Sequence, residues 1–326
     1  MTPRYPSPPH EPRLAGQKIN QTVNPLESQT CQSLPSHPSQ RLQSLSLADP
    51  STVKNSNLAK TLLWLPPGIR SDMLTFFRFC RAVDDLADGG NLTPACRTSQ
   101  LLEWKAALQG KGNLPTELTS LLKTRGIETD LLVAIVEGCL SDAGTVRFAT
   151  IQQLRDYCWK VACAVGLVCV KIFRCQSPES NQFAVHLGYA LQFTNICRDI
   201  SEDALFNRIY IPQEILHRHG TGTEALTKRR EDEKLKAAQS EIAQMACREF
   251  GLARRVFPTR DAARLRPACM MAAIYWCMLT KIRRPDQPIF GPRIRPSLLQ
   301  TLAILLAGKI IPPAWLLPDP PTASQN

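Results

Sequence analysis

The stretch that decides the fold is GYALQFTNICRDISEDALFNRIYIP, residues 188–212. An α-helix repeats every ~3.6 residues, so side chains three or four positions apart lie on one face. This spacing places four polar residues along a single stripe: Gln192, Asn195, Asp199 and Asp203. A second segment, FCRAVDDLAD at 79–88, places Asp84 and Asp88 one turn apart on another helix. Carboxylates aligned in this way repel one another unless a cation lies between them.

These two acidic stripes indicate a metal–diphosphate site. Hard divalent ions such as Mg²⁺ prefer oxygen ligands and commonly bridge one or two carboxylates to substrate phosphates. Two stripes that face each other would hold a diphosphate through Mg²⁺, with Mn²⁺ as an alternative ion. Taken alone, each aspartate is better explained as part of a solvated helix face, and only the joint pattern favours a site.

The composition indicates a globular, basic protein. Of 326 residues, 44% are hydrophobic and 21% are charged, which is ordinary for a soluble domain. The formal net charge of +11 favours anionic partners, namely diphosphates, anionic lipid surfaces or nucleic acid. We expect no nucleic-acid partner, because the chain has neither a basic stripe nor a recognisable binding motif for one.

Cysteine usage and hydropathy predict a cytoplasmic location. The twelve cysteines include no CxxC pair and no zinc-type spacing, which fits a reducing compartment. The most apolar stretch, 298–317, is interrupted by Lys309 and by Pro312–Pro313, so it is a poor transmembrane segment. Peripheral membrane contact for delivery of an apolar product stays open, and the sequence does not indicate an oligomeric state.

Three segments of different character follow one another along the chain. Residues 1–50 hold nine of the 26 prolines and few apolar residues, and are predicted to be disordered. A targeting segment or a mispredicted start are alternatives for this part. Residues 51–311 are predicted to form one helical, catalytic domain. Residues 312–326 are a Pro-rich tail that we expect to be extended.

Helical patterns fill the central segment, and no convincing strand pattern occurs. Thr150 and Gln153 form a predicted capping box that opens a helix to about residue 173. Ser177 before Pro178 predicts the start of the helix that carries the second acidic stripe. Further helices are expected over 71–88, 95–109, 128–142, 223–251, 265–282 and 296–308. The predicted fold class is all-α, a single helical bundle around a central cavity with two facing Asp-rich helices.

Several ordered motifs resemble the squalene/phytoene synthase family. The strongest are FCRAVDDLAD, YCWKVACAVG at 157–166 and LQFTNICRDISEDALFNRIYIP at 191–212. SNLAKTLLWLP at 56–66 and MAAIYWCMLTKI at 271–282 add support, so the resemblance covers roughly residues 56–295. It implies an isoprenoid-synthase fold and the head-to-head joining of two prenyl diphosphates with release of diphosphate.

The resemblance also implies roles for individual residues. The metal set is Asp84, Asp85, Asp88, Asp199 and Asp203. The catalytic set is Tyr157, Arg81 and Arg198. In it the phenol moves a proton or faces a carbocation, and the guanidinium groups bridge phosphates or orient a carboxylate. Core packing for the tyrosine and structural ion pairs for the arginines stay open.

The implied substrate-binding residues fall into a polar and an apolar group. The polar group is Gln192, Asn195, Arg208, Tyr210, Tyr275 and Arg293. The apolar group, which would line a dry channel, is Phe77, Ala162, Val165 and Gly166, with Leu58, Leu62 and Leu191 as further candidates. Each member of the apolar group is equally explained as ordinary core.

Departures from the family pattern leave the product open. Asn55, Leu58, Cys163 and Asn207 replace common family residues, although none of these changes removes an implied metal ligand. We expect farnesyl diphosphate as substrate and presqualene diphosphate or squalene as product, with NADPH required only for squalene. Phytoene from geranylgeranyl diphosphate is the first alternative. A terpene cyclase and a non-catalytic helical scaffold are further alternatives.

Overall fold

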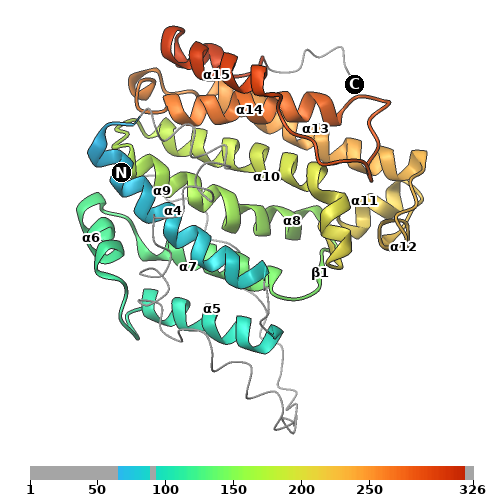
Figure 1. The fold of residues 1–326 in the computed structure, drawn as a ribbon, viewed down its shortest axis with the longest axis horizontal. Coiled ribbons are helices and arrows are strands. Elements are labelled where there is room, and N and C mark those ends of the chain that lie inside the picture. Colours follow the sequence, from blue (N-terminus) through green and yellow to red (C-terminus); the bar gives the residue numbers. More distant parts are fainter. Residues whose placement is uncertain (1–64, 89–92, 320–326) are drawn as a thin grey trace, which may run out of the picture.

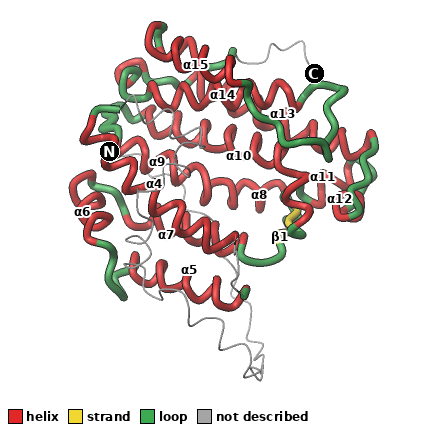
Figure 2. The backbone as a smooth tube through the Cα atoms, viewed as in Figure 1, coloured by secondary structure: helices red, strands yellow, loops and turns green. Residues whose placement is uncertain are grey.

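The structure, a computed structural model, describes residues 65–88 and 93–319. Predictions for residues 1–50, for Asn55, Leu58 and Leu62, and for most of the 56–66 motif lie outside this part. The described part is built almost entirely of helices (Figures 1 and 2). They are α4 (Pro67–Asp88), α5 (Pro94–Leu108), α6 (Thr116–Arg125), α7 (Thr129–Asp142), α8 (Ile151–Cys158), α9 (Ala164–Ile172), α10 (Glu179–Leu205), α11 (Gln213–Arg218), α12 (Thr223–Thr227), α13 (Glu233–Arg255), α14 (Arg266–Ile282) and α15 (Leu298–Ile310). The predicted all-α class is confirmed.

Short elements complete the chain. A π-helix, η2 (Trp159–Cys163), joins α8 to α9, and 3₁₀ turns occur at η3 (Thr259–Asp261) and η4 (Pro313–Leu316). Two two-residue strands, β1 (Val146–Arg147) and β2 (Arg208–Ile209), pair in parallel. The sequence pattern predicted neither strand, because two residues are too few to show an alternation.

Helix α10 is the central element of the bundle. It packs against α13, η2, α9 and α14 (Figure 1). Its buried face includes Phe183, Leu187 and Phe193, so one side of this 27-residue helix belongs to the core while the polar stripe faces elsewhere. Gly188 permits the close approach of η2, because a Cβ at this position would lie 2.8 Å from Cys163 Cα.

The start of α10 differs from the prediction. Ser177 was expected to cap the helix, but its hydroxyl pairs with Glu179, and Pro178 occupies the cap position. The carboxylate of Asp261 instead accepts the backbone N–H groups of Gln176 and Ser177, each at 2.7 Å. A partner more than 80 residues away thus binds the backbone just before α10, while the Ser180 N–H in the first turn donates to the Ser177 carbonyl instead of to a side-chain cap.

The other expected helices are present with shifted boundaries, whereas α6 (Thr116–Arg125) and α11 (Gln213–Arg218) were not predicted. Thr150 accepts a hydrogen bond from the Gln153 N–H, as predicted, and the expected helix to about residue 173 is continuous through η2. The expected helix over 223–251 is instead two helices, α12 and α13, with Arg229 at a φ of 50° between them.

The C-terminal segment packs more closely than expected. η4 belongs to the predicted extended tail, yet its Leu316 and the following Leu317 are buried in the core. Within the described residues, no helix combines the length and the apolar content needed to cross a bilayer.

Candidate active site

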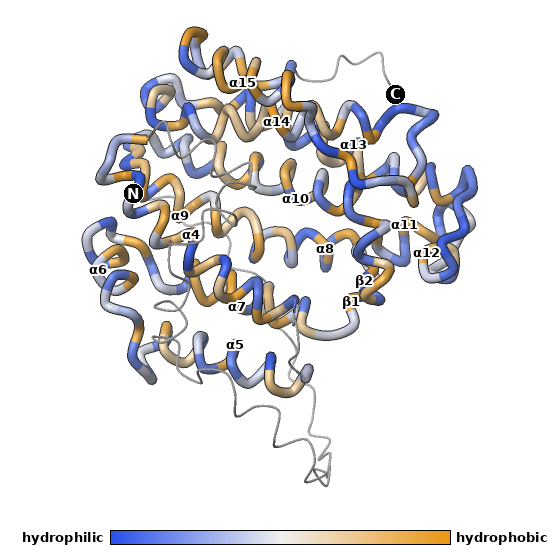
Figure 3. The backbone as a smooth tube through the Cα atoms, viewed as in Figure 1, coloured by the Kyte–Doolittle hydropathy of each residue, from blue (hydrophilic) through white to orange (hydrophobic). Residues whose placement is uncertain are grey.

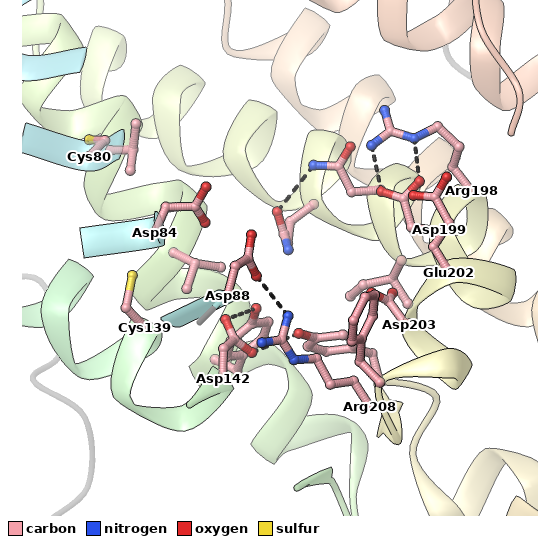
Figure 4. Close-up of a pocket in the computed structure, with 18 of the residues that line it drawn as sticks. Cys80, Asp84, Asp88, Cys139, Asp142, Arg198, Asp199, Glu202, Asp203 and Arg208 are labelled. Carbon is pink, nitrogen blue, oxygen red and sulfur yellow. Dashed lines mark hydrogen bonds and ion pairs between the residues drawn. The ribbon is translucent and has the colours of Figure 1, made fainter. Parts of the chain in front are cut away.

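A cavity of about 990 Å³ opens between α4, α7, α8, η2, α9 and α10. Asp84 and Asp88 line one wall from α4, and Asp199 and Asp203 line the facing wall from α10. Figure 4 shows these two groups of side chains on opposite sides of the space. The two acidic motifs, about 115 residues apart in the sequence, therefore share one cavity, as expected from the sequence.

Burial, together with a neighbouring carboxylate, raises the pKa of Asp84 and of Asp203. Burial and then the neighbouring Asp88 raise the pKa of Asp84 to about 6. Burial and then the neighbouring Asp199 raise the pKa of Asp203 to about 7. Charged oxygens that have lost water and face one another are stabilised by cations, which is the physical basis for a metal site here.

A buried side-chain oxygen without a hydrogen-bond partner among the described residues also supports a metal site here. Oδ1 of Asn195 is buried and has no hydrogen-bond partner among the described residues, while its Nδ2 faces Gln192 Oε1 at 3.4 Å. Asn195 lines the cavity beside Asp199, so an amide oxygen is available to a ligand or ion. In the described part of the chain, no three acidic, His or Cys residues enclose a metal site by themselves. Magnesium often takes only one or two carboxylates together with substrate phosphates, so the donor set fits an ion that binds with its substrate.

Arginine side chains surround the acidic mouth. Arg198 forms a two-pronged contact with Asp199, with Nε–Oδ1 at 2.7 Å and Nη2–Oδ2 at 2.5 Å. Arg293 approaches the same carboxylate, with Nε–Oδ1 at 3.0 Å, and also pairs with Glu202 at 3.1 Å. Planar guanidinium groups match phosphate oxygens as well as carboxylates, so this rim suits a diphosphate.

Arg208 connects the two motif-bearing regions. Its Nη1 lies 2.8 Å from Asp88 Oδ1, and its Nη2 donates to the Ala87 carbonyl at 3.1 Å. The preceding Asn207 has a φ of 56°, in the left-handed region that Asn and Gly adopt most readily. Asn207, one of the departures from the family pattern, is thus a residue type that this backbone conformation accepts.

Two tyrosine hydroxyl groups and one carboxylate form a hydrogen-bonded unit at the floor of the cavity. The hydroxyl of Tyr157 donates to Asp142 Oδ2 at 2.8 Å, and that of Tyr210 donates to Oδ1 at 2.7 Å. Burial raises the pKa of Asp142 to about 6, although the two hydroxyl groups act in the opposite direction. The sequence interpretation missed Asp142, since a single Asp at the end of α7 forms no repeated row.

The remaining wall is largely apolar. Phe77, Val161 and Val165 line it, together with Ile135 and Ile196. Phe77 and Val165 were predicted channel residues. The cavity thus has a charged mouth and an apolar interior, which suits a ligand with an anionic head and a long hydrocarbon tail.

Most predicted site residues meet at this cavity. Its walls include Arg81, Asp84, Asp88, Tyr157, Gln192, Asn195, Arg198, Asp199, Asp203, Arg208, Tyr210 and Arg293, in addition to Phe77 and Val165. Residues that the sequence interpretation did not single out also line it: Cys80, Ile135, Cys139, Asp142, Val161, Ile196, Glu202 and Phe206. Ile135, Cys139 and Asp142 do follow the helical period on one face of α7, but a face of mixed apolar, thiol and carboxyl groups is typical of ordinary core and does not indicate a site.

Four residues of the predicted metal and substrate-binding sets, and the further channel candidate Leu191, lie outside the cavity walls. Asp85 pairs with Arg81 at 2.6 Å, and Tyr275 is a hydrogen-bonding partner of Arg198. A Cβ at Gly166 would lie 3.0 Å from the Ala184 carbonyl oxygen, so this glycine allows α9 to pack against α10. Ala162, in η2, is likewise absent from the walls. The assigned roles of these four residues stay predictions.

Fold and site together define a helical enzyme of the isoprenoid-synthase kind. The family model for squalene/phytoene synthase matches residues 53–300. The chain belongs to the squalene/phytoene synthase family and is a prenyltransferase of that type.

Individual relatives support this assignment. A presqualene diphosphate synthase of Zymomonas mobilis is 31% identical over 81% of this chain and 93% of its own length. Phytoene synthase 2 of Solanum lycopersicum is 29% identical over 76% of this chain and 85% of its own length. The crystal structure of a dehydrosqualene synthase in complex with a ligand superposes with a TM-score of 0.66 at 26% identity, covering 83% of this chain and 98% of the other.

Proposed function

We propose that this enzyme joins two molecules of farnesyl diphosphate head to head and forms presqualene diphosphate. The observation that carries the proposal is the pair of opposed carboxylate rows in a single cavity, one wall of which is apolar. The cavity volume is at the upper end of the roughly 300–1,000 Å³ typical of ligand pockets, as two long chains require. The similarity to presqualene diphosphate synthases favours this product.

The acidic rows would hold the metal ions. Asp84 and Asp88 on one side, and Asp199 and Asp203 with Asn195 on the other, are the proposed ligands for Mg²⁺ or Mn²⁺. Such ions would supply Lewis-acid stabilisation of the leaving diphosphate. Asp85 remains a proposed member of the set, although Arg81 is its present partner.

Arginine side chains and apolar walls are the groups of the chain that we expect to act on the reacting substrates. Arg208 and Arg293 stand at the mouth, where their positive charge stabilises the negative charge that develops on the leaving group. The C1–O bond of the first substrate breaks, and the C2–C3 electron pair of the second attacks the resulting carbocation. The walls around Phe77 and Val165 exclude water from that cation.

The hydroxyl-carboxylate unit provides a route for the departing proton. Loss of a proton closes the cyclopropane ring of the product. We propose that Tyr157 takes up this proton while its own hydroxyl proton passes to Asp142. The 2.8 Å hydrogen bond and the pKa of about 6 for Asp142 support this role.

Phytoene formation from geranylgeranyl diphosphate is the second candidate function, because the tomato phytoene synthase covers a similar share of the chain. Squalene formation would additionally need NADPH as reductant. The family assignment leaves no support for the terpene-cyclase or scaffold alternatives. We further propose a cytoplasmic enzyme with peripheral membrane contact, since its product is too apolar to leave into water.

Product analysis tests the proposal. The purified chain is incubated with Mg²⁺ and either farnesyl or geranylgeranyl diphosphate, with and without NADPH, and the products are separated by chromatography. We expect presqualene diphosphate from farnesyl diphosphate without NADPH. Turnover of geranylgeranyl diphosphate alone would instead establish phytoene synthesis. No turnover of either substrate by a folded protein would contradict both.

A further inference from the structure

Helix α15 and the turn η4 carry an exposed apolar surface that the catalytic site does not use. In the described part of the chain, nine large apolar side chains are exposed, and six of them belong to this segment. We call these six residues the α15 face: Leu298, Leu299, Leu302, Leu306, Ile310 and Trp315. Their exposed fractions run from 46% for Leu302 to 81% for Ile310.

The composition of α15 makes this exposure unusual. Nine of its thirteen residues, LLQTLAILLAGKI, are hydrophobic, which is typical of a helix buried on all sides. Only Thr301 and Gly308 are buried, however, and Gly308 marks the closest approach to Met270 on α14. Figure 1 places α15 at the outer edge of the molecule beside α14, and Figure 3 colours much of it as hydrophobic.

The exposed residues form a continuous stripe. Leu298, Leu302, Leu306 and Ile310 follow one another at intervals of four, so they are neighbours on the helix surface. Trp315, 71% exposed, extends this stripe beyond the helix end. Tryptophan is enriched where one side of a protein meets the lipid–water boundary.

Basic groups lie at both ends of the stripe. Lys281 donates to the carbonyl of Arg295 at 3.0 Å near the start of α15, and Arg266 donates to the carbonyl of Ile311 at 3.0 Å near its end. Between residues 261 and 319 the sequence has eight Arg or Lys residues and three acidic ones, Asp261, Asp286 and Asp319. The segment around the apolar stripe therefore carries a net positive charge, although Arg264 and Arg293 are paired with acidic residues.

We propose that the α15 face binds the surface of an anionic lipid bilayer. Thirteen residues span about 20 Å, too short to cross a hydrocarbon core of about 30 Å but suited to lie in its interface. Leucine side chains and Trp315 enter the headgroup boundary, and the surrounding arginines and lysines meet the lipid phosphates. Arg293 lines the cavity and precedes Leu298 by only five residues, so the α15 face begins close in sequence to the cavity mouth.

Charge argues against two other occupants. A second copy of the chain would bring two basic surroundings together across one contact. The segment 1–64 holds six Arg or Lys and three acidic residues, so it too is basic. An anionic lipid surface alone has the complementary sign.

Vesicle sedimentation with the full chain tests the proposal. We expect wild type to bind vesicles of equal parts phosphatidylglycerol and phosphatidylcholine, and to bind pure phosphatidylcholine at least tenfold more weakly. Added salt should weaken the anionic binding, because screening shortens the reach of the charges. The double variant Leu302→Gln/Leu306→Gln should bind the anionic vesicles at least tenfold more weakly. The matched control is Leu102→Gln on α5, a 49% exposed leucine elsewhere, which should bind like wild type.

Two results would overturn the proposal. One is wild-type vesicle binding by the double variant. The other is a wild-type dimer that becomes monomeric in the double variant while neither protein binds vesicles, as seen by light scattering. The inference deepens the membrane contact proposed above, but binding is measured without substrate. If vesicle binding is not found, the proposed condensation reaction is unaffected. If no turnover is found, the proposed lipid-binding surface is unaffected.

Discussion

The substitution Asp142→Asn tests how the floor of the cavity is built. Asp142 accepts hydrogen bonds from Tyr157 and Tyr210 through its two oxygens. Asparagine keeps the shape but offers one acceptor oxygen and one donor group in place of two acceptors. One tyrosine hydroxyl therefore loses its acceptor, and the carboxylate that takes up the proton is removed.

The size of the expected change in stability follows from the pKa of Asp142, which is raised to about 6. Because the folded protein holds this proton more tightly than the unfolded chain, whose Asp pKa is 3.8, the free energy of unfolding falls as the pH rises from about 4 to about 6. At about 1.4 kcal/mol for each pKa unit, the shift is worth up to about 3 kcal/mol. Asp142→Asn removes this contribution, so wild type should lose up to about 3 kcal/mol more than the variant between pH 4 and pH 7.

Urea unfolding at a series of pH values measures the difference. The control is Asp130→Asn, an exposed aspartate at the start of the same helix, which should keep the wild-type pH dependence. We also expect the turnover number of Asp142→Asn to fall by about 10²-fold or more, within the range for general acid–base groups. If the stability curves of Asp142→Asn and wild type run parallel from pH 4 to pH 7, the assigned burial of this charge is wrong.

Two further predictions concern the support of the cavity. Gly188→Ala should lower the free energy of unfolding, measured with urea, by about 1–3 kcal/mol, because the new Cβ meets the backbone of η2 at 2.8 Å. The control is Gly68→Ala, which has open space around it and should be neutral or slightly stabilising. Glu249 accepts from Arg155 at 2.9 Å and contacts His186 at 2.7 Å, and although burial acts against it, these partners lower its pKa. Glu249→Gln should therefore cost about 1–3 kcal/mol at pH 7, and the difference should shrink as the pH falls below 4.5, where the carboxylate takes up its proton. An unchanged difference at pH 4 would contradict the assigned charge state.

The sequence specified the site wherever a row of residues repeats with the helical period. Asp84 and Asp88, and likewise Asp199 and Asp203, could be placed on one face from spacing alone. Spacing within a helix says nothing about its neighbours. That both rows share one cavity was instead a hypothesis from the chemistry of aligned carboxylates, which need a cation, and the resemblance to a family strengthened it.

Features set by distant partners could not be predicted in this way. Asp142 carries two hydrogen bonds from hydroxyl groups that are 15 and 68 residues away, and nothing around it in the sequence marks it. The segment before α10 is held by the buried carboxylate of Asp261, which accepts the Gln176 and Ser177 N–H groups, and Ser177 does not cap the helix as its sequence position suggested. The break between α12 and α13 falls in a polar stretch whose pattern still suits a helix.

The Mg²⁺ dependence of diphosphate release tests the central claim most directly. Wild type, Asp84→Asn and Asp203→Asn are compared with farnesyl diphosphate over a range of Mg²⁺ concentrations, and circular dichroism confirms equal helix content. We predict that wild type requires Mg²⁺ and that each nearly isosteric variant loses about 10²-fold or more of its activity at limiting Mg²⁺. Wild-type turnover by either variant at limiting Mg²⁺ would contradict the proposed role of that carboxylate in holding the metal ion.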